Sequence, residues 1–180
     1  MEKRNKVFIA TSLDGYIADK NGGLDWLHSI PNPDQEDMGY LPFMDEVDAL
    51  IMGRTTFETV LGFDCEWPYT KPVFVLSTQL TEIPESHKGK AFFMKGSLTE
   101  VLQQVHAKGY HHLYIDGGST IQGFLKEDLI DDLIITTIPV LLGGGSSLFG
   151  DLKAPLNFEY VSTKVFLGKV PQIRYKRVRE

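Results

Sequence analysis

A short stretch in the first third of the chain puts phosphate-binding side chains where a strand gives way to a helix. In LIMGRTTFETVL (residues 50–61), an apolar run is followed by Gly53, Arg54, Thr55 and Thr56 and then by an amphipathic pattern. The first N–H groups of a helix lack intrahelical partners and carry partial positive charge. Guanidinium and hydroxyl donors fit phosphate oxygens, so the stretch predicts a phosphate site. The other interpretation is a threonine N-cap with a surface arginine that pairs with Glu58.

Two further strand ends carry similar side chains. Ser77 and Thr78 follow the apolar run VFVL, and the stretch GGST follows LYID at residues 117–120. Alone, ordinary turn chemistry explains each of them. Because the carboxyl ends of parallel strands meet at one edge of a sheet, we expect the three strand ends to lie close together. Two phosphates and a ribose are the groups that a dinucleotide would present there.

The elements that must position these residues alternate along the chain. Strands are expected at 6–12, 48–53, 71–79, 90–96, 111–118 and 131–145, and a closing pair near 157–167 and 170–178. Helices are expected at 33–47, 54–61, 97–108 and 119–127, the first weakened by Gly39 and Pro42 and the third opened by a capping box at Ser97 and Glu100. This order predicts an α/β fold with a mostly parallel sheet, helices on both faces and a C-terminal antiparallel hairpin. We expect residues 1–180 to form a single domain.

Composition argues against several classes of protein. The net charge is -6, from 24 acidic and 18 basic residues, and the bases are scattered, which argues against binding to nucleic acid or to an anionic membrane. The one cysteine, Cys65, excludes a disulfide framework and a cysteine zinc site within the chain, and it favours the cytoplasm. The five histidines show no ligand spacing, so no metal is expected. The N-terminus shows neither a signal peptide nor a membrane span.

The ordered set of motifs resembles a known family. IMGRTTFETV, VFVLSTQ and YIDGGSTIQGFL resemble the dihydrofolate reductase fold family, whose fold has three layers. ATSLDGYIADKNGGLDWL and LKEDLIDDLIITTIPVLLGGGSSLF are most similar to one branch, the C-terminal reductase domain of the bifunctional riboflavin-biosynthesis deaminase-reductase. The zinc ligands of that enzyme's deaminase domain are absent, so the resemblance implies a stand-alone reductase domain.

The resemblance implies NADPH as the cofactor and assigns residues to it. Arg54, Ser77 and Thr78 would meet the 2′-phosphate, and Thr56 would meet the pyrophosphate. The backbone at Gly117 and Gly118 would approach the pyrophosphate and the nicotinamide. The remaining cofactor residues are Gly53, Thr55, Ser119 and Thr120 beside the phosphates, and Ala10 and Ile17 beside the nicotinamide ring.

The resemblance also implies an acid for the reaction. Asp37 falls at the family's carboxylate and Thr136 at the threonine that bridges to it, and burial beside apolar neighbours would raise the pKa of that carboxyl. A one-residue shift would align Asp34 or Glu36 instead, and acids at a helix start also serve the helix dipole alone. Asp116 stands where dihydrofolate reductases usually have a glycine. Its carboxylate should point away from the pyrophosphate or accept a hydrogen bond from a ribose or a backbone donor.

The expected reaction is NADPH-dependent hydride transfer to a C=N bond of a small pyrimidine or pterin-like molecule. The resemblance implies the family's best-known substrate, 5-amino-6-(5-phosphoribosylamino)uracil, or another small heterocycle in its place. Asp14 and Trp26 resemble the branch's substrate-side loop, although Asp14 fits a turn equally well. Two other functions stay open, dihydrofolate reductase proper and a non-catalytic NADPH-binding protein. The branch implies a homodimer, with the hairpin at 157–178 as a candidate edge.

Overall fold

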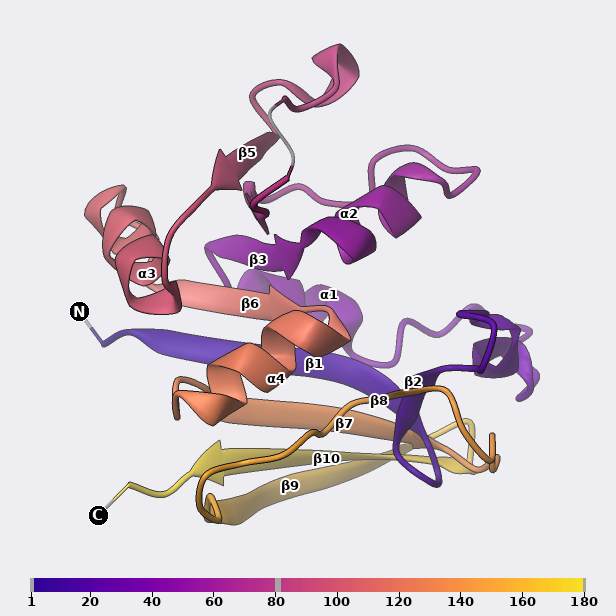
Figure 1. The fold of residues 1–180 in the computed structure, drawn as a ribbon. Helices are drawn as coiled ribbons and strands as arrows, with labels where there is room; N and C mark the ends of the chain where they lie inside the picture. Colours follow the sequence, from indigo (N-terminus) through magenta and orange to yellow (C-terminus); the bar gives the residue numbers. More distant parts are fainter. Residues whose placement is uncertain (1, 80–81, 180) are drawn as a thin grey trace.

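The computed structural model describes residues 2–79 and 82–179, and a large sheet runs through its centre (Figure 1). Eight strands form it in the order β5-β4-β3-β6-β1-β7-β10-β9. Neighbours from β5 to β7 pair in parallel, whereas β10 is antiparallel to both β7 and β9. The strands are β1 (Arg4–Ser12), β3 (Ala49–Gly53), β4 (Val73–Leu76), β5 (Ala91–Met94), β6 (His112–Asp116), β7 (Asp132–Ile138), β9 (Phe158–Phe166) and β10 (Val170–Arg177). The predicted fold class, with its closing hairpin, is confirmed.

Helices cover both faces of the sheet. They are α1 (Tyr40–Asp45), α2 (Arg54–Leu61), α3 (Leu98–Ala107) and α4 (Gly118–Lys126), with two 3-10 turns at η1 (Asp25–His28) and η2 (Glu85–His87). In Figure 1, α3 and α4 lie in front of the sheet and α1 lies behind it. Phe124 of α4 belongs to the apolar core on one face, and Phe43 of α1 and Phe57 of α2 belong to the core on the other face. The sheet is therefore the middle of three layers.

The third expected helix begins as its sequence predicts. Ser97 is the N-cap of α3, its hydroxyl accepts from the Glu100 N–H at 3.3 Å, and the Glu100 carboxylate accepts from the Ser97 N–H at 2.8 Å. This reciprocal pair satisfies two donors that the first helical turn cannot use. The capping box is confirmed.

The helix expected over 33–47 is much shorter, and only Tyr40–Asp45 is helical. Gln35, Met38 and Gly39 have φ angles of 51°, 52° and 83°, which belong to the left-handed region. A right-handed helix cannot continue through these residues. The acidic residues 34, 36 and 37 therefore lie in a turn that leads into α1.

The long strand expected over 131–145 is also shorter, because β7 ends at Ile138. Pro139 follows directly and has no N–H for a strand ladder. Gly143, Gly144 and Gly145 have positive φ angles, and the chain turns there. The next residues form β8 (Ser146–Ser147), which pairs with β2 (Tyr16–Ala18), and neither short strand was predicted. In the described part of the chain, no helix has the length and apolar character needed to cross a membrane.

Candidate active site

Two neighbouring strand ends meet through close contacts that require glycine. α2 starts where β3 ends and α4 starts where β6 ends, and these strands are paired. A Cβ on Gly53 would stand 2.9 Å from Thr120 Oγ1, and one on Gly117 would overlap Thr56 Oγ1. Gly117 also has a φ of 91°, which favours glycine. The structure therefore brings the helix starts at Thr56 and Thr120 together, as the sequence predicted.

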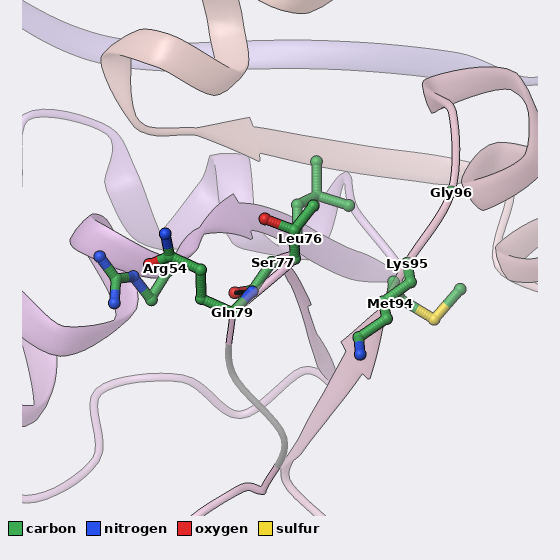
Figure 2. Close-up of a pocket in the computed structure, with 8 residues that line it drawn as sticks. Arg54, Leu76, Ser77, Gln79, Met94, Lys95 and Gly96 are labelled. Atoms are coloured by element: carbon green, nitrogen blue, oxygen red, sulfur yellow. Dashed lines mark hydrogen bonds between the residues drawn. The ribbon is translucent and has the colours of Figure 1, made fainter.

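The end of β4 contributes a pocket beside these helix starts. The pocket has a volume of about 340 Å³, and Arg54, Ser77, Thr78 and Lys95 are among its lining residues. Figure 2 shows Arg54 and Lys95 on opposite sides of the turn at Ser77. The Arg54 side chain is 42% exposed, and its contact with Glu58 is loose at 3.8 Å. Two cationic and two hydroxyl side chains are thus among the residues that line this pocket.

Both interpretations of these polar residues hold in part. Ser77 Oγ accepts from the Gln79 N–H at 3.1 Å, which is ordinary turn chemistry. The surface pairing of Arg54 with Glu58 also exists. The threonine N-cap is wrong, because α2 starts at Arg54 and its N-cap, Gly53, has no side chain to cap it.

The expected nicotinamide side lies at the ends of β1 and β7. Ala10 is the register partner of Thr136 on the neighbouring strand. The Ile17 side chain lies against Gly118, because a Cβ there would stand 2.7 Å from Ile17 Cδ1. Thr55 and Ser119 are exposed in the first turns of α2 and α4. The structure thus gathers the predicted cofactor residues along one edge of the sheet.

Asp116 is a carboxyl with an unusual environment at this edge. It ends β6, directly before the start of α4, and its Oδ1 accepts from the Gly117 N–H at 2.8 Å. Burial raises the pKa of Asp116 to about 6, although hydrogen bonds with Gly117 and Tyr114 act in the opposite direction. The expected acceptor role toward a backbone donor is confirmed. A carboxyl with this pKa can give up a proton near neutral pH.

Tyrosines from three parts of the chain surround this carboxyl. Burial, followed by the Asp116 charge, raises the pKa of Tyr40 to about 12 and raises that of Tyr69 further. Tyr114 precedes Asp116 on the same face of β6, and its hydroxyl donates to the Phe8 carbonyl at 3.0 Å. The three phenols therefore stay protonated at neutral pH, and they lie near Asp116, which is itself half-buried.

Asp37 does not have the environment expected for the acid. Its carboxylate is exposed and accepts from the Gly39 and Leu41 N–H groups at 2.9 and 2.8 Å. These backbone hydrogen bonds lower the pKa of Asp37, and the bond from the Leu41 N–H has the larger effect. The predicted burial and raised pKa are both wrong, because the turn before α1 uses the carboxylate as a local cap.

Thr136 is buried, but it contacts an amide where the resemblance places a carboxylate. Gln172 Nε2 donates to Thr136 Oγ1 at 2.9 Å and to the Met38 carbonyl at 2.9 Å. Gln172 comes from β10, which pairs with β7. The bridge between Thr136 and Asp37 that the resemblance implied is thus replaced by a bridge between Thr136 and Gln172.

The two tentative substrate residues have different surroundings. The Asp14 carboxylate accepts from Ser12 Oγ at 2.6 Å and from the N–H groups of Leu142 and Gly143 at 3.1 and 2.8 Å. These bonds hold two loops together, which agrees with the turn interpretation of Asp14. Trp26 is buried in an apolar cluster, and its Nε1 has no hydrogen-bond partner among the described residues. Within that same part of the chain, no group of three or more His, Cys, Asp or Glu residues could hold a metal ion.

Comparison with known proteins places the chain in a family. A family model described as the RibD C-terminal domain matches residues 6–170. The chain belongs to the RibD C-terminal domain family. This match confirms the resemblance to the reductase domain of the riboflavin enzyme, and it supports a reductase of the RibD type.

Relatives of this RibD-type chain agree with the assignment. A protein from Shewanella sp. PV-4, provisionally assigned to riboflavin biosynthesis, has a crystal structure with a TM-score of 0.95 and 56% identity, over 98% of this chain and 99% of that one. The uncharacterized protein YwjB of Bacillus subtilis (strain 168) is 35% identical over 180 residues, which cover 98% of this chain and 99% of YwjB. Dihydrofolate reductase from Enterococcus faecalis, solved with NADP(H), has a TM-score of 0.69 and 19% identity over 98% and 97% of the two chains, and it shows the fold alone.

Sequence reasoning missed several residues near this candidate site, among them Lys95, Tyr40 and Tyr69. Lys95 follows β5 and lines the pocket, whereas Tyr40 and Tyr69 surround Asp116. A signal existed for Lys95, since it follows an apolar run at a fourth parallel strand end. Tyr69 lies in an irregular loop, and no pattern in the sequence relates it to Asp116.

Proposed function

We propose that this chain is an NADPH-dependent reductase that acts on a C=N bond of a small nitrogen heterocycle. Family membership supports a reductase of the RibD type. The finer statement rests on one observation: a pocket with two cations and a carboxyl with a raised pKa share the carboxyl edge of one sheet. The family's substrate, 5-amino-6-(5-phosphoribosylamino)uracil, is the first compound to test. The expected homodimer and cytoplasmic location stay predictions.

The pocket residues fit the phosphate end of NADPH. Arg54 and Lys95 would share the charge of a 2′-phosphate, and Ser77 and Thr78 would donate to its oxygens. The starts of α2 and α4 would offer backbone N–H groups to the pyrophosphate, and Gly53 and Gly117 let these two helix starts lie close together. NADH lacks the 2′-phosphate, so these cations predict a preference for NADPH.

The protein's own chemical task is to supply a proton and exclude water. When bound, NADPH supplies a hydride, that is, two electrons and a proton, which adds to the carbon of the C=N bond. We propose that Asp116 gives its proton to the nitrogen, so that an amine and NADP⁺ result and Asp116 is left as the carboxylate. Burial of this carboxyl raises its pKa, so that it can hold a proton for transfer at mildly acidic pH.

A thermal shift titration tests the cofactor part without any substrate. At about 100 times its Kd, a ligand adds about 2.7 kcal/mol of stability, which is roughly 5–10 °C for a chain of this size. We expect NADPH to raise Tm more than NADH does. We also expect Arg54→Ala and Lys95→Ala each to raise the Kd for NADPH about tenfold or more, with little change in the Kd for NADH. Lys90→Ala is the matched control, because Lys90 is an exposed lysine at the other end of β5.

Two results would count against the proposal. Equal shifts with NADPH and NADH in the wild type would remove the assignment of Arg54 and Lys95 to a 2′-phosphate. NADPH binding without oxidation of NADPH in the presence of 5-amino-6-(5-phosphoribosylamino)uracil or pterins would leave a binding protein and not a reductase.

A further inference from the structure

Gln172 of the closing hairpin reaches into the candidate site from the far end of the sequence. It lies on β10 as the direct register partner of Thr136 on β7, so both side chains project from the same face of the sheet. The residue is 9% exposed, and both amide hydrogens are used, one on Thr136 Oγ1 and one on the Met38 carbonyl, each at 2.9 Å. A buried side chain amide with both donors satisfied has one defined orientation.

This orientation fixes the hydrogen-bond polarity of Thr136. A hydroxyl has one hydrogen to donate and two lone pairs that accept. Because the Gln172 amide donates to it, the Thr136 hydroxyl is an acceptor in this bond and its own hydrogen is left for another partner. Thr136 lies beside Ala10, at the strand ends where the resemblance places the nicotinamide. A substrate atom over Ala10 would thus meet a hydroxyl donor.

The second bond holds the turn that leads into α1. Met38 and Gly39 have φ angles of 52° and 83° and form the turn directly before Tyr40. Tyr40 follows and starts α1, and its phenol is one of the groups near Asp116. By holding the Met38 carbonyl, Gln172 ties the start of α1 to the same sheet position as Thr136.

We infer that Gln172 is a positioning residue of the reductase site, which directs the Thr136 hydroxyl toward the substrate as a donor and holds the Met38 turn in register with it. The inference rests on the proposed reductase function. It concerns a residue in the last strand of the sheet, more than 30 residues beyond Thr136 in the sequence and on the hairpin that closes the fold. The substrate side of the site would thus depend on β10 as well as on the parallel strands.

A double-mutant cycle on NADPH oxidation tests this directly. Gln172→Met keeps the size of the side chain and removes both donors, and Thr136→Val removes the hydroxyl. We expect each single variant to lower kcat/KM about tenfold. The kcat/KM of the double variant should lie within about twofold of that of either single variant, because Gln172 acts through Thr136. NADPH affinity should stay within about twofold of the wild type in all three, since the phosphate pocket is at other strand ends.

A matched control separates positioning from general stability. Asn5 is also a buried amide that donates to a main-chain carbonyl, Leu129 O at 2.7 Å, but it lies at the opposite end of β1. Asn5→Leu should lower Tm without changing kcat/KM. A variant with reversed polarity, Gln172→Glu, should lose more activity at pH 8 than Gln172→Met, because a carboxylate can only accept from Thr136.

The inference and the proposed function fail in different ways. If the wild type turns over and the effects of the two single variants multiply to about a hundredfold, the inference about Gln172 is wrong and the reductase stands. If the wild type turns over no substrate, the proposed function fails. Hydrogen exchange then decides the positioning role, because Gln172→Met should speed exchange of the Gly39 to Leu41 amides at least tenfold relative to Asn5→Leu. Unchanged exchange there would overturn it.

Discussion

At the scale of single residues, the environment of a carboxyl matters more than its place in an alignment. Asp37 occupies the position that the resemblance assigns to an acid, yet two backbone N–H groups lower its pKa. Asp116 occupies a position that dihydrofolate reductases give to glycine, and burial raises its pKa to about 6. Desolvation favours the neutral form and backbone donors favour the charged one, so Asp116 holds its proton to a higher pH than Asp37 does.

Substitution of Asp116 by Asn should separate its chemical role from its effect on stability. The amide can still accept from the Gly117 N–H but has no acidic proton. We expect kcat to fall about a hundredfold, and we expect the wild-type rate to decline as pH rises through about 6, where the carboxyl loses its proton. A full wild-type rate in Asp116→Asn would assign the proton to another donor.

The same variant should be more stable than the wild type at alkaline pH. The pKa of Asp116 in the folded protein lies above its ordinary value of 3.8, because folding disfavours the ionised carboxylate. Ionisation therefore lowers the free energy of unfolding, by an amount that grows between pH 3.8 and about 6 and is constant above that. Urea denaturation at pH 8 should show Asp116→Asn more stable by about 2 kcal/mol, with little difference at pH 3.5. An unchanged difference between the two pH values would contradict the raised pKa.

At the scale of elements, local signals identified some helices and not others. α3 has a complete capping box and formed where the sequence predicted it. The helix expected over 33–47 had acidic residues at its start and apolar spacing, but left-handed residues at 35, 38 and 39 stop it before Tyr40. The left-handed conformation of Met38 is held by the rest of the fold through Gln172, so a local pattern contains no signal for it.

The capping box of α3 offers a measure of that local contribution. Ser97→Ala removes the acceptor for the Glu100 N–H and should destabilise the protein by about 1 kcal/mol, or roughly 2–4 °C in Tm. Ser162→Ala, at an exposed position on β9, is the control and should leave Tm nearly unchanged. Calorimetry of the two variants measures the difference, and equal Tm values would mean that packing alone holds the start of α3.

At the scale of the whole molecule, one ionic network ties strands from both ends of the chain to α1. Glu46, just after α1, accepts from Arg174 of β10 at 3.1 and 2.9 Å and from Lys6 of β1 at 2.7 Å. The Lys6 side chain is only 6% exposed, so Glu46 compensates a cation that water scarcely reaches. The hydrogen bonds from Arg174, and then those from Lys6, lower the pKa of Glu46 to about 2.

Glu46→Gln should therefore weaken the fold in a pH-dependent way. A lowered folded pKa contributes stability that is present above the ordinary value of 4.5 and is lost as pH falls toward 2. Because Glu46 is partly exposed and Lys6 is buried, we expect a loss on the order of 2 kcal/mol at pH 7. Urea denaturation should show that the difference in the free energy of unfolding between wild type and Glu46→Gln is smaller at pH 3 than at pH 7. The same difference at both pH values would contradict the lowered pKa of Glu46.

The parallel sheet and the gathering of the proposed phosphate residues followed from the sequence, and the contacts of Thr136 and Asp116 did not. Short apolar runs that end in Gly, Ser and Thr are local patterns, and the rule that parallel strand ends share an edge places Arg54, Ser77 and Gly117 together. The bridge from Gln172 to Thr136 depends on the pairing of β10 with β7. The tyrosines around Asp116 come from distant segments, and only the folded chain brings them together.

The strand order also has a consequence for synthesis on the ribosome. β1 is made first, but its sheet partners are β6 and β7, which follow about 100 residues later, or roughly 5–20 s at cellular rates of translation. β3, β4 and β5 pair in the order in which they emerge, so the strands whose ends form the pocket can assemble while β1 is still an unpaired apolar segment. Of the eight strands of the sheet, β10 is made last, so the strand that carries Gln172 to the site joins the sheet only after its partner β7 is available.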